Sequence, residues 1–258
     1  MMKPVSRLSA VLTMAVLAAP VAAEEKQSLD QAANDPTASL MSFQLQNLYS
    51  PNVYNFDGET NTVLFRAVVP SHWMGLDHIT RLTMPYVTDS VSGKTGVSDT
   101  TIFDMAVFEQ DWGRFGAGVV GLIPTGDRGL GAGQWAIGPA LGFAVQKENF
   151  LWGLFNQNLF SVAERFDGQD VNLSTLQPLF NYGLGNGWSA GISEMTIVYD
   201  WDAGEFTSLP LGVKISKMTR PGGVPVQLSG TYEHNFYDEG SGPEDTVGFT
   251  VKVLLPTG

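Results

Sequence analysis

Residues 246–255 read TVGFTVKVLL, and apolar residues in this stretch alternate with small or polar ones. The apolar face holds Val247, Phe249, Val251, Val253 and Leu255. The other face holds Gly248, Thr250 and Lys252. A two-residue period is typical of a β-strand with one apolar side. A soluble sandwich would bury that side in its core, whereas a transmembrane barrel would turn it toward lipid and keep Thr250 and Lys252 in the lumen.

Residues 1–23 have the organisation of a secretory signal peptide. Lys3 and Arg7 precede an apolar run at 8–19, and small residues at 21–23 offer a cleavage site. No later segment reaches the roughly 18 to 20 continuous apolar residues of a spanning helix. The chain contains no cysteine, which excludes disulfides, thiolate metal sites and a lipidated cysteine. We therefore predict export without a helical or lipid anchor.

The composition narrows the class of protein further. The net charge of -12 argues against a nucleic-acid partner. Charged residues make up 16% of the chain, below the roughly 25% of ordinary soluble domains. An exported chain that is poor in charge and has no helical span is typical of a bacterial outer-membrane barrel, with a secreted β-domain as the alternative.

Alternation and turn residues predict about twelve strands. They cover 41–50, 60–69, 78–87, 100–108, 113–123, 135–145, 150–160, 171–182, 188–199, 207–217, 224–237 and 246–255. Connections at one end of these strands are mostly longer than those at the other, as in outer-membrane barrels, although 70–77 is long for a periplasmic turn. Pro139 and Pro178 are unusual within strands, and we expect bulges there.

The predicted fold is all-β, a transmembrane up-and-down antiparallel β-barrel of about twelve strands in the outer membrane of a Gram-negative bacterium. The predicted divisions are a signal peptide at 1–23, a periplasmic N-terminal segment at 24–40 that could sit in the barrel mouth, and the barrel at 41–258. The first and last strands should pair, because an open edge would leave backbone groups unsatisfied in lipid.

All six tryptophans fall at or near predicted strand ends, where the aromatic girdles of a barrel meet the membrane interface. They are Trp73, Trp112, Trp135, Trp152, Trp188 and Trp201. Along 135–145, large residues should face outward and alanine or glycine inward. Small inward residues would leave space inside the barrel.

Seven charged residues are predicted to face the lumen. The cations are Arg66, Arg81, Lys214 and Lys252, and the carboxylates are Asp104, Glu194 and Glu233. Lone charges are expensive in such a place, so we expect ion pairs across the lumen, with Lys252 bonded to an inward carboxylate such as Glu233. Twelve strands lie between the filled eight-strand barrels and the open porins, which predicts a constricted path.

The sequence predicts neither a metal site nor a cofactor. His72, His78 and His234 lack any ligand spacing. There is no GxSxG motif, and Ser229 and His234 face opposite ways on one strand, so we predict that the protein is not an enzyme. A lipid-modifying barrel enzyme, the least favoured alternative, would need a serine beside a histidine on the outer surface.

Six short motifs, in order along the chain, resemble a known family. They are RLTMPYV at 81–87, the IPT of 121–126, GQWAIGP at 133–139, LQP at 176–178, YDW at 199–201 and LPLG at 209–212. The chain resembles the bacterial outer-membrane family called the MetA-pathway of phenol degradation family, whose members are often mislabelled neuromedin U. The resemblance implies an outer-membrane β-barrel that takes up small aromatic or apolar compounds, and it assigns no binding residue.

These observations together predict an outer-membrane channel for small molecules, working by passive or gated diffusion through a polar constriction. The competing hypothesis is a structural or interaction barrel with a closed lumen. Expected partners are membrane lipid, a small solute, lipopolysaccharide near the acidic loops 200–205 and 238–245, and the barrel-insertion machinery. That machinery usually recognises a final aromatic residue, whereas this chain ends LPTG and has Phe249 nearby.

Overall fold

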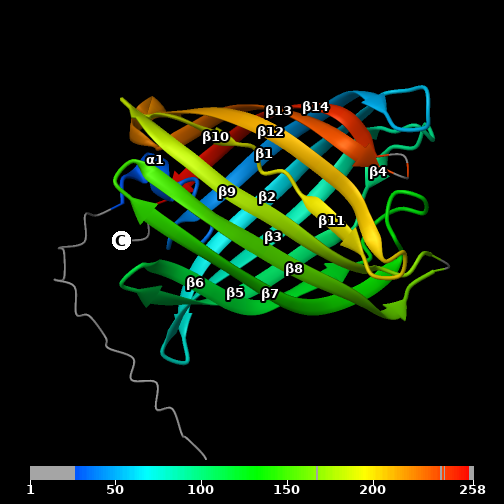
Figure 1. The fold of residues 1–258 in the computed structure, drawn as a ribbon, viewed down its shortest axis with the longest axis horizontal. Helices are drawn as coiled ribbons and strands as arrows, with labels where there is room; N and C mark the ends of the chain where they lie inside the picture. The colour runs from blue at the N-terminus through cyan, green and yellow to red at the C-terminus, as the bar shows by residue number, and fades with distance from the viewer. Residues whose placement is uncertain (1–26, 167, 239, 241, 256–258) are drawn as a thin grey trace, which may run out of the picture.

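The computed structural model describes residues 27–166, 168–238, 240 and 242–255, so the predicted signal peptide lies outside it. The described chain forms a closed antiparallel β-barrel of twelve strands, shown in Figure 1, which confirms the predicted fold. β1 (Met41–Val53) pairs with β14 (Pro243–Leu255) and closes the wall, with Leu45 opposite Val251. Each of the twelve wall strands therefore has two neighbours, and the wall leaves no open edge to lipid.

Between these two strands the chain runs around the wall in sequence order. The elements are β2 (Thr60–Trp73), β3 (Leu76–Asp89), β5 (Thr100–Gln110), β6 (Gly113–Ile123), β7 (Gln134–Lys147), β8 (Phe150–Glu164), β9 (Asn172–Gly185), β10 (Trp188–Ile192), β11 (Ile197–Asp200), β12 (Glu205–Thr219) and β13 (Val226–Asp238). β10 and β11 are two parts of one wall strand, and the short β4 (Gly96–Val97) pairs with β3 only. Two short helices are α1 (Leu29–Ala32) and η1 (Pro221–Gly223). Neither helix in the described part of the chain has the length and apolarity needed to cross a membrane.

The two ends of the barrel differ in their connections. One end carries both described chain ends and mostly tight turns, and the other carries the longer loops. In outer-membrane barrels the short turns are periplasmic, so the end near α1 is the periplasmic end. The connection predicted at 70–77 is wrong, because β2 and β3 continue to a turn at Met74 and Gly75, both with positive φ (52° and 78°). The hairpin extends beyond the wall in Figure 1, which explains its length in the sequence.

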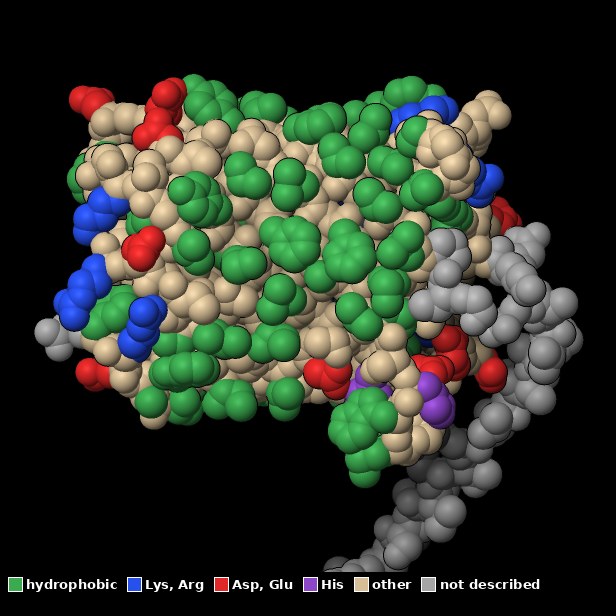
Figure 2. Space-filling view, turned by 180° about the vertical axis from the view of Figure 1, so that it is seen from behind, with side chains coloured by type: hydrophobic (Ala, Val, Ile, Leu, Met, Phe, Trp, Pro, Cys, Tyr) green, Lys and Arg blue, Asp and Glu red, His purple; other side chains and the backbone are tan. Residues whose placement is uncertain are grey.

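The outer wall between the two ends is apolar. Figure 2 shows hydrophobic side chains spread over the wall, with most charged side chains toward the two ends. On β14, Val247 and Phe249 are more than half exposed, whereas Thr250 is buried inside. The facing predicted for this strand is confirmed, and this surface belongs against lipid in an outer membrane.

The inner wall has two chemically different halves. The lumen side of β5–β9 carries an apolar cluster that includes Phe103, Met105 and Phe155. The lumen side of β12–β14 and β1 carries buried polar groups that include Gln44 and Lys214. The strand order places these two halves on opposite sides of the barrel. The lumen is therefore amphipathic rather than uniformly polar.

The N-terminal segment 27–40 lies inside the periplasmic end of the barrel. Lys252 Nζ on β14 donates to the Ala33 carbonyl oxygen at 2.9 Å, and Gln31 donates to the Glu148 carbonyl oxygen at 2.9 Å. Ala33, Ala38 and Leu40 pack against Leu254, which is fully buried. The described part of the predicted N-terminal segment thus fills one mouth of the barrel.

Candidate functional site

Of the cavities inside the described barrel, two border a shared layer of charged and polar side chains. The inner cavity, beside the N-terminal segment, has a volume of about 110 Å³. The outer cavity, toward the long loops, has a volume of about 350 Å³. Arg66, Gln177 and Glu194 line both cavities. We refer to this layer, which borders both cavities, as the constriction.

An ion pair crosses the lumen at the constriction. Arg66 Nη1 on β2 lies 2.5 Å from Glu194 Oε2, which comes from residues 193–196 between β10 and β11. Arg66 Nε also donates to Thr83 Oγ1 at 3.3 Å on the neighbouring strand. The strand order places β2 nearly opposite β10 and β11. The pair therefore spans the lumen, as predicted for these inward charges.

The carboxylate of Glu194 reaches this position because the wall strand is interrupted. β10 pairs with β12 up to Ile192 and with β9 up to Gly191, and β11 resumes pairing with β9 at Ile197. Pro178 of β9 and Pro210 of β12 lie beside the gap on the two neighbouring strands. A proline has no N–H to donate, so each removes one bond that would otherwise hold the strand in register. The bulge expected at Pro178 is wrong, because its pairing with β8 is regular and the irregularity lies in the neighbouring strand.

Pro139 does not produce a bulge either. The pairing of β7 with β8 is interrupted between Ile137 and Ala140, but the register is the same on both sides. Asn158 fills the interruption by donating from its side chain to the Pro139 carbonyl oxygen at 3.2 Å. A side-chain amide thus replaces part of the strand ladder at this position.

Gly212 provides room for the interrupted strand. Its carbonyl oxygen accepts from Ser193 N–H at 3.1 Å. A Cβ at this position would collide with Ser193 Oγ and Glu233 Cγ, and would lie 2.7 Å from the Tyr232 carbonyl oxygen. The missing side chain therefore lets residues 193–196 turn inward.

A Gly212→Ala substitution is expected to lower the free energy of unfolding by about 1 to 3 kcal/mol, as overpacking does. The added methyl group would push Ser193 away and weaken the Arg66–Glu194 pair. The matched control is Gly230→Ala on the neighbouring β13, where a Cβ would meet nothing within 4 Å. The midpoint of thermal unfolding, read from the gel shift between folded and unfolded barrel, measures both. Equal stability of the two variants would contradict this account of Gly212.

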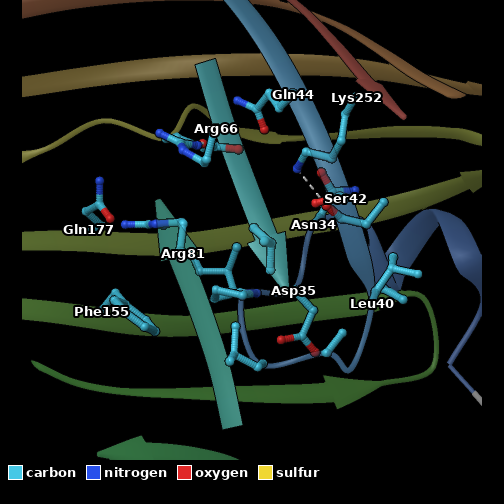
Figure 3. Close-up of a pocket in the computed structure, with 18 of the residues that line it drawn as sticks. Asn34, Asp35, Leu40, Ser42, Gln44, Arg66, Arg81, Phe155, Gln177 and Lys252 are labelled. Carbon is cyan, nitrogen blue, oxygen red and sulfur yellow. Dashed lines mark hydrogen bonds and ion pairs between the residues drawn. The ribbon is translucent and has the colours of Figure 1, made fainter. Parts of the chain in front are cut away.

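The other three cations of the inner cavity have no carboxylate partner among the described residues. The Arg81 guanidinium lies 4.3 Å from the centre of the Phe103 ring. Lys252 donates to a backbone carbonyl of the N-terminal segment. Lys214 is 8% exposed and forms neither a hydrogen bond nor an ion pair within the described chain. In Figure 3, Arg66 and Arg81 extend from neighbouring strands, and Gln177 lines the same cavity.

The N-terminal segment is held by a second ion pair. Asp35 Oδ2 lies 2.5 Å from Arg114 Nη2 on β6, and the Asp35 side chain is fully buried. The same carboxylate accepts from Gln27 at 2.9 Å and from the Thr37 N–H at 2.8 Å. All these bonds satisfy a charge that would otherwise be costly to bury.

Six of the seven predicted lumen residues face the interior. The inner cavity is lined by Arg66, Arg81, Glu194, Lys214 and Lys252, and the outer cavity by Glu233. The prediction for Asp104 is wrong, because it faces outward and accepts from Thr80 at 2.6 Å, with His78 Nδ1 at 2.7 Å. Its neighbours Phe103 and Met105 face inward instead. Apolar residues mark the lipid-facing side of a strand only where the lumen is polar, and this half of the lumen is apolar.

The predicted contact between Lys252 and Glu233 is also wrong. Lys252 lies opposite Gln227 on β13, and Glu233 lies opposite Thr246. Six residues along a strand separate the two side chains by roughly 20 Å. Lys252 bonds the N-terminal segment instead, and Glu233 faces the outer cavity.

The six tryptophans lie near strand ends and are between 42% and 55% exposed. Near the periplasmic end are Trp73, Trp112, Trp152 and Trp188, and near the other are Trp135 and Trp201. The Phe143 ring lies 5.6 Å from Trp152 and 6.3 Å from Trp112, between centres. Trp73 adjoins the turn of the β2–β3 hairpin, which extends beyond the wall, and the role of the six tryptophans as two girdles stays a prediction.

Sequence reasoning missed the Asp35–Arg114 pair and the aromatic side of the inner cavity. Arg114 lay in a glycine-rich stretch whose facing was ambiguous, and Asp35 lay in an irregular segment. Phe155 fills space over Gly142, where a Cβ would lie 2.5 Å from one atom of its ring. An inward glycine facing an aromatic residue on the adjacent strand is the signal that could have indicated this packing.

The histidines are bonded to aspartates. Besides His78 with Asp104, His72 Nδ1 lies 2.7 Å from Asp77, and His234 Nδ1 lies 3.0 Å from Asp245. Ser71 is the cross-strand neighbour of His78, but within the described ranges no hydrogen bond joins them. His78 is only 8% exposed, and its ring centre lies 4.6 Å from that of Trp73. A substrate would have little access to this histidine.

Two solved structures share this architecture. The COG4313 outer membrane channel from Pseudomonas putida F1 is 15% identical, with a TM-score of 0.60, covering 84% of this chain and 94% of that chain. The NanC porin is 7% identical, with a TM-score of 0.56, covering 84% of this chain and 100% of that chain. No family model and no curated protein matches the sequence. At these identities the likeness is one of fold, and that fold is the outer-membrane β-barrel.

Proposed function

We propose that this protein is an outer-membrane channel for small molecules, gated at its periplasmic end by the N-terminal segment. The observation that carries the proposal is the pair of internal cavities that meet at the Arg66–Glu194 layer. A barrel with a purely structural role would not need two internal cavities that are large enough to hold water. A polar constriction between them is how channels combine passage with selectivity.

The proposal also covers the class of solute that the channel carries. The amphipathic lumen supports small solutes with an apolar portion, in keeping with the resemblance to the MetA-pathway of phenol degradation family. We propose membership of that family on the strength of the six motifs and the shared fold of the COG4313 channel. The buried histidine beside Asp104 supports a role without catalysis.

The absence of native cysteine allows a direct test of the path. Gln177 lines both cavities, so a Gln177→Cys variant places a single thiol at the constriction. A bulky methanethiosulfonate reagent is expected to lower the bilayer conductance of this variant by more than half. The matched control is Phe180→Cys on the same strand, where Phe180 is 43% exposed on the outer wall.

Wild-type protein and the Phe180→Cys variant should keep their conductance after the same treatment. A Gln177→Cys variant that conducts but does not respond to the reagent would show that ions do not pass between the two cavities. Absence of conductance in all three proteins would favour the competing function.

The competing function is a structural barrel with a closed lumen. The specific observation in its favour is the buried Asp35–Arg114 pair, which seals the periplasmic mouth. Under this hypothesis, releasing the segment would destabilise the barrel without creating a path.

A further inference from the structure

The inner cavity combines an aromatic wall with a cationic wall. Phe103 and Phe155 contribute from the apolar half of the lumen, with ring centres 5.6 Å apart. Lys214 and Lys252 contribute from the polar half, and Arg81 lies between, over the Phe103 ring. A ligand that satisfies both walls must itself have an apolar face and a charged end.

The charges of the inner cavity are not balanced by protein groups. Four cations line it, together with the carboxylates of Asp35 and Glu194. Asp35 is bonded to Arg114 and Glu194 to Arg66. Arg81, Lys214 and Lys252 form no ion pair in the described chain, and Glu194 is the one carboxylate that interacts electrostatically with all three, so positive charge is in excess here. Buried charges without partners are costly, and an anion bound among these three would remove that cost.

The size of the cavity limits the apolar part of the ligand. Its volume is about 110 Å³. An apolar protein cavity of about 150 Å³ takes up benzene, so this space suits about one ring with its substituent directed at the cations. Stacking on Phe103 also fixes the plane of the Arg81 guanidinium, which leaves its N–H groups free for a planar carboxylate.

We propose that the inner cavity is a binding site for a small aromatic carboxylate. The ring lies against Phe103 and Phe155, and the carboxylate accepts from Arg81, Lys214 and Lys252. The inference rests on the proposed channel function and specifies its solute class. Lys252 has three donors, so it can hold the carboxylate and the Ala33 carbonyl oxygen at the same time.

Calorimetric titration of the full-length protein in detergent tests the site. The probes are benzoate, benzyl alcohol, which keeps the ring but not the charge, and acetate, which keeps the charge but not the ring. Benzoate is expected to bind saturably, and both other probes at least tenfold more weakly. Benzyl alcohol or acetate binding as tightly as benzoate would overturn the proposal.

Substitutions test the cationic wall. Arg81→Gln and Lys214→Gln should each weaken benzoate binding about tenfold, as expected for loss of a charge-assisted hydrogen bond. The control is Lys217→Gln on the same strand as Lys214, because Lys217 lies 4.9 Å from the outward Trp188 ring and should not affect binding. The heat-induced gel shift confirms that each variant is a folded barrel. Undiminished binding by both folded lumen variants would overturn the proposal.

These experiments distinguish a failure of the proposed binding site from a failure of the channel hypothesis. Benzoate that does not bind to a protein with reagent-sensitive conductance would overturn the aromatic carboxylate site and leave the channel intact. Saturable binding to a protein that never conducts would support the site and overturn the channel.

Discussion

An Asp35→Ala variant is expected to conduct several times more current per molecule in planar bilayers than the wild-type protein. The Asp35 side chain is fully buried and pairs with Arg114, while also accepting from Gln27 and Thr37. Breaking a buried ion pair by removing one partner costs about 3 to 5 kcal/mol, and the remaining bonds of the segment are mostly neutral. The N-terminal segment should then leave the lumen in a measurable fraction of molecules.

The control for this experiment is Asp30→Ala in the same segment. Asp30 has no ion pair among the described residues, so its removal should leave the conductance unchanged. An Arg114→Ala variant should resemble Asp35→Ala, because it breaks the same pair. Exchanging the two charges, with Asp35→Arg and Arg114→Asp combined, should restore part of the closure. A barrel that stays closed in both single variants would favour the structural hypothesis.

A Glu194→Gln variant is expected to make the conductance strongly selective for anions and to destabilise the barrel. Glu194 is the carboxylate that pairs with Arg66 at the constriction, where three further cations line the inner cavity. Neutralising it leaves four cations facing one another without a carboxylate at this layer. Because the Glu194 side chain is 38% exposed, solvent screens part of this interaction, and the expected loss of stability is about 1 kcal/mol. The reversal potential in a salt gradient and the thermal unfolding midpoint measure the two effects.

The double variant Arg66→Gln with Glu194→Gln provides the internal comparison. It removes both partners of the pair, so it should be more stable than Glu194→Gln alone. Glu164→Gln is the surface control, because Glu164 is exposed at the end of β8. Unchanged selectivity and stability in Glu194→Gln would contradict the assignment of the constriction.

Most of the wall could be predicted from alternation. A period of two residues identifies a strand wherever one side faces lipid, and lipid accepts only apolar side chains over the whole outer surface. That constraint explains why the strand at 246–255 was predicted correctly. The pairing of β14 with β1 could also be predicted, because a barrel in lipid can leave no strand edge unpaired. The β2–β3 hairpin was missed because its tip extends beyond the wall, where the constraint no longer applies.

The lumen was harder to predict, because its inner surface obeys no single rule. Arg66 and Lys214 were placed inside correctly, since a charge on the lipid side is expensive. Asp104 was misplaced, because His78 and Thr80 on the neighbouring strand can satisfy an outward carboxylate. To predict which lumen charges contact each other, one would need the register between strands that lie far apart in the sequence. The contact of Lys252 with the Ala33 carbonyl oxygen, for example, joins residues at opposite ends of the chain.

The interruption between β10 and β11 also ties the wall and the lumen to each other. Backbone at bilayer depth that lacks strand partners is tolerated only where it faces protein or a water-filled space. Residues 193–196 meet this condition because they turn toward the two cavities. Filling the constriction with apolar side chains would therefore leave peptide groups without water or partners. The barrel can therefore close this layer by forming different ion pairs among its charged side chains, but not by filling it with apolar side chains that exclude water.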